Sequence, residues 1–231
     1  MASRRSTLGS IACLACAGLF GAPRARATTT PVSRTTLTPD QAIARLLDGN
    51  RRFVADDPTP IDAGAGRRER LAAGQAPFAT IICCADSRAP PETLVQAGLG
   101  EVFVARVAGN TIPPVDLATV AYGVEALGTP AVMVLGHEAC GAVTAAVEVV
   151  TRGAIIPPIM QPMLGPIIFA VNAVRNQPGD LVDNAVRENA KAGARSLIRN
   201  PDFAEKIRVG TLKVVAARYD LHAGKIELLE L

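Results

Sequence analysis

Residues 78–88, FATIICCADSR, place an uncharged run directly before a cluster of reactive and charged side chains. Residues 78–83 have the length of one strand and are almost entirely apolar, which is typical of a strand buried on both faces of a parallel sheet. Cys84, Asp86 and Arg88 follow at once. Because ligands of open α/β sheets bind at the carboxyl ends of the strands, this stretch predicts both the fold class and the position of the site.

Further apolar runs alternate with helical segments along the chain. We expect strands at residues 78–83, 102–105, 131–135, 212–217 and 225–229. We expect a helical arm that begins at residues 38–41 with a capping box, and helices at residues 68–73, 117–127, 141–150, 166–174 and 183–199. This order predicts an α/β fold with a mainly parallel central sheet of about five strands and flanking helices. A turn at residues 220–224 would make the last strand antiparallel.

Composition and charge exclude several classes of protein. Of the 231 residues, 49% are hydrophobic and 19% are charged, which excludes an intrinsically disordered chain. No apolar run reaches the roughly 18–20 residues of a membrane span. The net charge is +3, but residues 1–27 hold four arginines and no acid, so the rest of the chain carries 20 basic and 21 acidic residues. A nucleic-acid or anionic-lipid partner is therefore not indicated.

Residues 1–27 have the three zones of an export signal. Arg4 and Arg5 form a positive start, an apolar stretch follows, and Ala25-Arg26-Ala27 is a typical cleavage site. The paired arginines indicate a twin-arginine signal and export to the periplasm. An uncleaved anchor helix is the alternative. We expect residues 28–37 to be a linker and residues 38–231 to be the folded domain.

A second cluster follows the strand expected at residues 131–135. His137 and Cys140 are three residues apart, so at a helix start they lie on one face. Together with Cys84 and Asp86 they would meet at one edge of the sheet, and these residue types are ligands of tetrahedral zinc. The alternative is that each cysteine is a small buried apolar residue. Two clusters at equivalent strand ends favour the metal site.

These motifs resemble those of the β-class carbonic anhydrases. The matching segments are C-x-D-S-R at residues 84–88, G-H-x-x-C-G-A at 136–142, the segment FVARVAGN at 103–110, and the turn at 219–225. The resemblance covers residues 38–231, is strongest over 75–145 and is weak over 150–200.

The resemblance implies one zinc ion per chain, held by Cys84, His137 and Cys140. The fourth ligand would be water, or Asp86 in a closed state. Zinc-bound hydroxide would then attack carbon dioxide and yield bicarbonate and a proton. Arg88 would hold Asp86 away from the metal, and Asp86 would then accept a hydrogen bond that orients the hydroxide.

The resemblance also implies a substrate site shared between subunits of a homodimer or homotetramer. Gln75 would donate a hydrogen bond to the substrate, and Phe103 and Tyr122 would line an apolar slot. Gly141 offers a backbone N–H at a helix start, where an anion can bind. Core packing is the alternative role for the two aromatic residues.

Two other functions fit the same residues. One is hydrolysis of carbonyl sulfide or carbon disulfide at the same zinc ion, because the metal ligands do not distinguish these molecules from carbon dioxide. The other is a non-catalytic zinc protein in which Asp86 stays on the metal. Arg88 argues against the second, since it offers Asp86 another partner.

Overall fold

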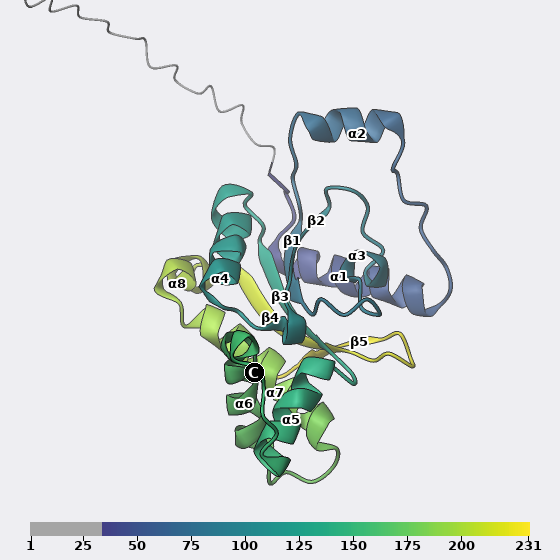
Figure 1. Cartoon of the computed structure of the whole chain (residues 1–231). Helices are drawn as coiled ribbons and strands as arrows, with labels where there is room; N and C mark the ends of the chain where they lie inside the picture. Colours follow the sequence, from purple (N-terminus) through teal and green to yellow (C-terminus); the bar gives the residue numbers. More distant parts are fainter. Residues whose placement is uncertain (1–33) are drawn as a thin grey trace, which may run out of the picture. The chain divides into compact units, whose positions relative to one another are not determined.

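The sheet contains five strands in the order β2-β1-β3-β4-β5 (Figure 1). This computed structural model describes residues 34–231. The strands are β1 (Ala79–Cys83), β2 (Val102–Arg106), β3 (Ala131–His137), β4 (Lys213–Tyr219) and β5 (Ile226–Leu229). The first four are parallel and β5 is antiparallel to β4, which confirms the predicted fold class. The predicted signal peptide and most of the predicted linker lie outside the described residues.

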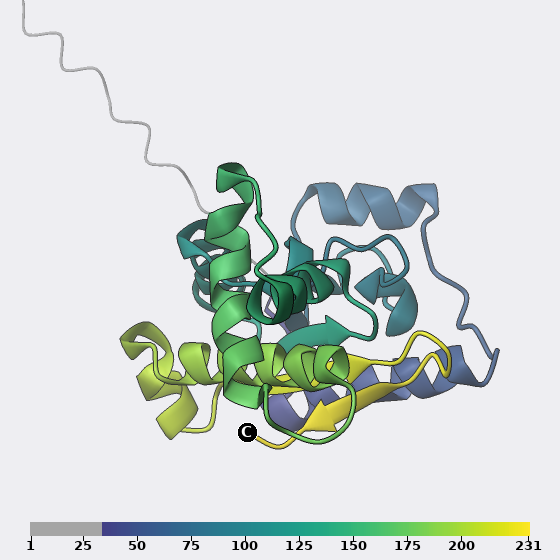
Figure 2. The same cartoon turned by 60° about the horizontal axis from the view of Figure 1, so that its bottom comes forward.

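Helices cover both faces of the sheet. The α-helices in residues 34–231 are α1 (Pro39–Val54), α2 (Ala65–Ala72), α3 (Pro91–Leu94), α4 (Pro114–Ala121), α5 (Gly141–Arg152), α6 (Gln161–Val174), α7 (Leu181–Ile198) and α8 (Pro201–Arg208). Apolar residues of α1 and α3 pack on one face of the sheet, and those of α4, α7 and α8 pack on the other. A third apolar cluster joins α5, α6 and α7, the green helices of Figure 2, and includes Cys84 and Cys140.

The alternation of side chains along β1 separates two adjacent cysteines. Cys83 packs in the cluster with α1, whereas Cys84 packs in the cluster with α5 and α6. This is the pleat of a β-strand continued by one residue. The two thiols therefore face opposite sides of the sheet.

The helical arm begins as the capping box predicts. The Thr38 side chain accepts a hydrogen bond from the Gln41 N–H, and the Gln41 side chain accepts one from the Thr38 N–H. Pro39 occupies the first turn, where its missing N–H costs no hydrogen bond. Among residues 34–231, no helix is long and apolar enough to cross a membrane.

Several predicted boundaries were wrong. Helix α6 begins at Gln161 instead of at residue 166, because Pro162 is tolerated in a first turn and Pro166 is accommodated inside the helix. Helices α3 and α8 are too short for a clear apolar period and were not expected. Strand β3 extends to His137, so this residue ends the strand rather than following it.

Candidate metal centre

Three buried side chains converge where β1 and β3 end. Cys84 follows β1, His137 is the last residue of β3, and Cys140 immediately precedes α5. Their potential ligand atoms all lie within 4.8 Å of one another. Parallel pairing of β1 with β3 produces this meeting, since it brings the ends of the two strands to the same edge of the sheet.

A sharp turn between β3 and α5 returns Cys140 to the cluster. Ala139 adopts a left-handed conformation, with φ of 50°. Such a conformation is unfavourable for a residue with a Cβ, so it marks a locally constrained turn. Arg88 Nη2 donates to the Ala139 carbonyl oxygen over 3.3 Å, which ties this turn to the loop after β1.

The donor atoms fit a tetrahedral zinc ion. The sulfur atoms of Cys84 and Cys140 are 3.9 Å apart, too far for a disulfide and close to the ~3.8 Å expected for two thiolates on one zinc. His137 Nδ1 lies 2.8 Å from the Glu138 carbonyl oxygen, to which it donates when protonated. His137 Nε2 is buried and has no hydrogen-bond partner among the described residues. A ring whose Nδ1 is held by a carbonyl and whose Nε2 is free is the usual arrangement of a zinc ligand.

The surroundings of Cys84 stabilise a thiolate. Its sulfur accepts hydrogen bonds from the backbone N–H groups of Gly109, at 3.2 Å, and Asp86, at 3.4 Å. The Cys140 thiol, followed by His137 and these two N–H groups, lowers the pKa of Cys84 to about 4 despite its burial. The charge of Cys84 and burial raise the pKa of Cys140. A metal held by both sulfurs would need both as thiolates, so its binding would release protons.

Arg88 holds the carboxylate of Asp86 from two sides. The Arg88 Nε and Nη2 atoms donate to the two oxygens over 2.9 and 2.7 Å, and its backbone N–H donates over 2.9 Å. These bonds keep the pKa of Asp86 well below its usual range. Asp86 Oδ2 lies 3.8 Å from His137 Nε2, at the edge of the cluster but not among its three potential ligands. The structure therefore shows the arrangement in which Arg88, rather than a metal, would be the partner of Asp86.

The residues predicted to bind substrate fall into two groups. Gly141 begins α5 beside Cys140. Apart from its chain neighbours and the backbone of α5 itself, nothing lies within 4 Å of the place where a Cβ would stand, so the backbone is open there. Phe103 on β2 pairs with Thr80 on β1. Thr80 is four residues before Cys84, so this pair lies about 13 Å from Cys84 along the strand direction. Phe103 and Tyr122 pack against each other with ring centroids 5.9 Å apart, and Tyr122 is 54% exposed. Gln75 precedes β1, so this chain does not bring it, Phe103 or Tyr122 to its own cluster.

Other residues around the cluster were not predicted to have a role. Arg106 Nε donates to the Cys84 carbonyl oxygen over 3.0 Å, and its Nη2 donates to the Asp86 carbonyl oxygen over 2.6 Å. Gly109 donates to the Cys84 sulfur. Only the resemblance of residues 103–110 to the family segment pointed to Arg106 and Gly109. Each of their hydrogen bonds uses a backbone group, which nearly every residue type has, so no sequence motif marks these contacts.

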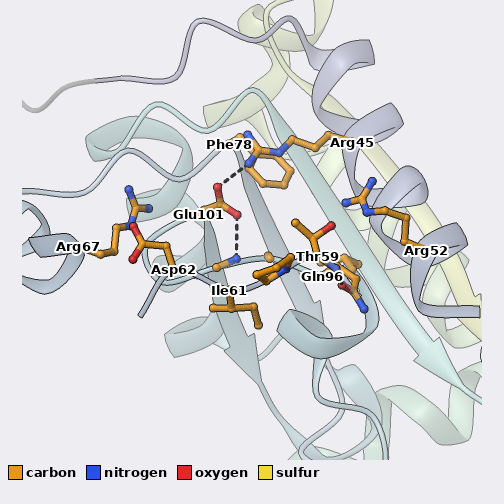
Figure 3. Close-up of a pocket in the computed structure, with 13 residues that line it drawn as sticks. Arg45, Arg52, Thr59, Ile61, Asp62, Arg67, Phe78, Gln96 and Glu101 are labelled. Carbon is orange, nitrogen blue, oxygen red and sulfur yellow. Dashed lines mark hydrogen bonds and ion pairs between the residues drawn. The ribbon is translucent and has the colours of Figure 1, made fainter. Parts of the chain in front are cut away.

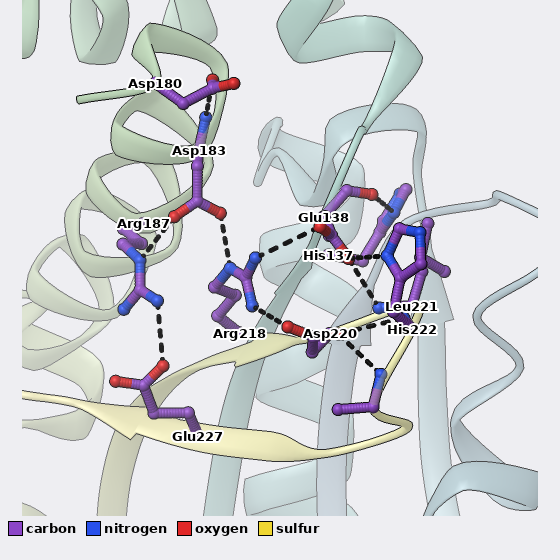
Figure 4. A network of polar contacts seen from close by, with 11 residues as sticks. His137, Glu138, Asp180, Asp183, Arg187, Arg218, Asp220, Leu221, His222 and Glu227 are labelled. Carbon is purple, nitrogen blue, oxygen red and sulfur yellow. Dashed lines mark hydrogen bonds and ion pairs between the residues drawn. The ribbon is translucent and has the colours of Figure 1, made fainter.

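Glu138 and Arg218 link the turn between β3 and α5 to the hairpin of β4 and β5 (Figure 4). Arg218 is 8% exposed and pairs with Asp183 on α7, with Asp220 in the hairpin and, at 3.8 Å, with Glu138. Glu138 Oε2 accepts the Leu221 N–H over 3.0 Å. These bonds brace the peptide whose carbonyl orients the His137 ring.

A cavity of about 340 Å³ lies near the other end of β1 (Figure 3). Arg45, Arg52, Phe78 and Glu101 are among its lining residues. Arg45 lies 4.2 Å above the Phe78 ring centroid and pairs with Glu101 over 2.6 Å. Phe78 is six residues before Cys84, so this cavity is separate from the metal cluster.

Comparisons with known proteins show which family the chain resembles. The family described as carbonic anhydrase matches residues 79–226. The chain is 34% identical over 191 residues to Carbonic anhydrase 2 of Mycobacterium tuberculosis, covering 82% of this chain and 92% of the relative. It is 32% identical over 195 residues to a carbonic anhydrase of Pseudomonas aeruginosa, covering 80% of this chain and 86% of the relative.

Solved structures of the β class have the same fold. A tetrameric β-carbonic anhydrase of Sordaria macrospora superposes with a TM-score of 0.65 at 29% identity, covering 71% of this chain and 86% of that one. The β-carbonic anhydrase CafA of Aspergillus fumigatus gives a TM-score of 0.65 at 27% identity, covering 81% and 90%. The chain therefore belongs to the β-class carbonic anhydrase family.

Proposed function

We propose that this protein catalyses the reversible hydration of carbon dioxide to bicarbonate with one zinc ion per chain. The observation that carries the proposal is the buried set of Cys84, His137 and Cys140. Its His137 Nε2 has no hydrogen-bond partner within residues 34–231, and its two sulfurs are spaced for one metal. Zinc held by three protein ligands would supply a nucleophilic hydroxide near neutral pH.

Asp86 and Arg88 would keep this centre open. Arg88 binds both carboxylate oxygens, so Asp86 remains ionised and outside the ligand set. From this position Asp86 Oδ2 is within 3.8 Å of His137 Nε2, close enough to accept a proton or a hydrogen bond from a group at the centre. Gly141, with open space beside its backbone, would contact the anionic product.

We infer that a second copy of the chain completes the substrate site. Gln75, Phe103 and Tyr122 lie away from the cluster of their own chain, and Tyr122 is exposed at the side of the sheet where β2 is the edge strand. A homodimer or homotetramer would place these residues beside the partner's metal. The tetrameric neighbour from Sordaria macrospora supports an oligomer.

Stopped-flow measurement of carbon dioxide hydration, with zinc counted per chain, tests the proposal. We expect fast turnover near one zinc per chain and roughly 10²-fold slower turnover for Asp86→Ala. Full zinc content without hydration between pH 7 and 9 would reject it. Carbonyl sulfide and carbon disulfide are then the next substrates to assay, and inactivity toward both would leave a structural zinc site.

We also propose that the protein acts in the periplasm after removal of residues 1–27. The support is the paired Arg4 and Arg5 and the Ala25-Arg26-Ala27 cleavage motif. Cell fractionation and the amino-terminal sequence of the mature protein test this. We expect a periplasmic protein that begins near Thr28, and a full-length cytosolic protein would refute export.

A further inference from the structure

A buried residue on α7, far in sequence from both predicted metal-binding loops, is connected by hydrogen bonds to one of the proposed metal ligands. Asn189 lies on α7, is 6% exposed, and donates from Nδ2 to the carbonyl oxygen of Gly109 over 2.7 Å. Gly109 in turn donates its N–H to the sulfur of Cys84 over 3.2 Å. The two hydrogen bonds restrain the backbone on both sides of the Gly109 Cα.

The conformation of this segment needs such a restraint. Gly109 has φ of 72° and Asn110 has φ of 46°, so two consecutive residues are left-handed. A Cβ at Gly109 would stand 2.4 Å from Cδ1 of Ile167 and 3.1 Å from Cβ of Ala142, so α5 and α6 close the other side. Glycine has more accessible backbone conformations than any other residue. Without its hydrogen bond to α7, Gly109 would therefore leave this conformation more readily than another residue would.

We propose that Asn189 is a positioning residue, which aims the Gly109 N–H at the Cys84 sulfur and thereby sets how strongly this thiolate donates to the metal. The inference rests on the proposed function, since it assumes that Cys84 binds the catalytic zinc. A hydrogen bond to an ionised sulfur withdraws electron density from it. Partners of metal ligands typically change metal affinity by 10–100-fold when they are removed.

Cobalt-loaded protein gives a readout that a merely structural role would not move. Asn189→Leu and Asn189→Ala both remove the donor, whereas Asn189→Gln retains an amide. We expect the two donor-less variants to shift the thiolate-to-cobalt absorption band to longer wavelength. Chelator competition should show about tenfold weaker metal binding, because the Gly109 N–H no longer holds the Cys84 thiolate in its metal-binding position. We expect Asn189→Gln to lie nearer to the unmodified protein in both measurements.

Asn50 provides a matched control. It is 3% exposed and donates to the carbonyl oxygens of Leu94 and Gly224, neither of which belongs to the metal cluster. We expect Asn50→Leu to lower stability at least as much as Asn189→Leu and to leave the cobalt band unchanged. An equal shift in both variants, or none in the Asn189 variants, would overturn the inference.

If the variants do not fold, a measurement on the unmodified protein tests the hydrogen bond from Gly109 to Cys84, on which the inference depends. In the cadmium-113-loaded protein, the amide proton of Gly109 should show a scalar coupling to the metal through the Cys84 sulfur. Its absence at full cadmium occupancy would overturn the inference. If the unmodified protein binds neither cobalt nor cadmium through thiolates, the proposed function fails instead.

Discussion

Cys83 and Cys84 show how one residue step changes the chemistry of a side chain. Burial raises the pKa of Cys83 to about 12, and its sulfur lies 3.9 Å from the Ala105 carbonyl oxygen, its hydrogen-bond acceptor. The next thiol faces Cys140, His137 and two backbone N–H groups, and its pKa falls to about 4. Only the second is prepared to bind a metal near neutral pH.

Alanine substitution should separate the two cysteines. We expect Cys84→Ala to lose zinc and activity together, because one of three protein ligands is gone. Cys83→Ala should keep one zinc per chain and lose roughly 1 kcal/mol of unfolding free energy through the cavity it leaves. Metal analysis and urea unfolding check this, and loss of zinc from Cys83→Ala would contradict it.

Removal of the Arg88 side chain should close the centre without emptying it. In Arg88→Ala the Asp86 carboxylate loses both guanidinium bonds, and its pKa returns toward the usual range. We expect the carboxylate to move onto the metal, with unchanged zinc content and roughly 10²-fold slower hydration.

The matched variant is Arg88→Lys. It keeps the charge but not the two-point grip on the carboxylate, so its rate should be intermediate. If Arg88→Ala retained the full stopped-flow rate, Arg88 would not be needed for catalysis.

At the scale of elements, helix α7 supports the candidate metal centre through two sets of contacts. Asn189 reaches the loop beside Cys84, and Asp183 anchors the buried Arg218 of β4, which also pairs with the β4–β5 turn. The same helix carries Arg187, which pairs with Glu227 on β5 over 2.9 Å. Helix α7 thus joins the metal edge of the sheet to its antiparallel end.

This network predicts how stability depends on pH. Burial acts to raise the pKa of Asp183, but the bonds from Arg187 and Arg218 outweigh it and lower the pKa. A carboxylate with a lowered folded-state pKa stabilises the fold above its unfolded pKa, near 4, and this stabilisation is lost as the pH falls further. We expect Asp183→Asn to lose roughly 2 kcal/mol at pH 7 and to flatten the acid side of the stability profile.

Urea unfolding at pH values from 7 to 3 measures both effects. Asp48→Asn is the control, because Asp48 also pairs with two arginines but lies on the exposed side of α1. We expect little change there. A profile for Asp183→Asn that runs parallel to that of the unmodified protein would exclude this role of the network.

At the scale of the whole molecule, the candidate metal ligands lie apart from three of the predicted substrate residues, Gln75, Phe103 and Tyr122. Gln75 precedes β1 and the metal ligands follow it, so the length of the strand separates them. Side chains at opposite ends of one strand meet only when a second copy brings its own end of the sheet alongside.

Mixed oligomers test whether sites are shared. Gln75→Ala and Cys84→Ser should each be weakly active alone. When they are unfolded, mixed in equal amounts and refolded with zinc, half of the dimers should be mixed, and one of their two sites should be complete. We expect recovery of about a quarter of the unmodified activity. No recovery, with mixed oligomers present by mass spectrometry, would show that Gln75 serves its own chain.

Much of the site could be predicted because its residue types are unusual. Only two histidines occur in the chain, and His137 stands three residues before a cysteine that follows a core strand. By contrast, the sequence predicted a helix only from residue 166, although α6 begins at Gln161, among prolines. Proline excludes a helix only where its N–H and its space are needed, and this depends on position within the helix.

The sequence by itself predicted the sheet, its parallel core and the three residues that meet in the candidate metal centre. Strand length, apolar content and the residues at strand ends are local properties, which a linear pattern records. Only the tertiary structure decided that Asp86 pairs with Arg88, that Asn189 holds Gly109, and that Gln75 lies away from its own cluster. Hydrogen bonds between segments distant in sequence depend on backbone direction and helix placement, and these are fixed only when the chain packs.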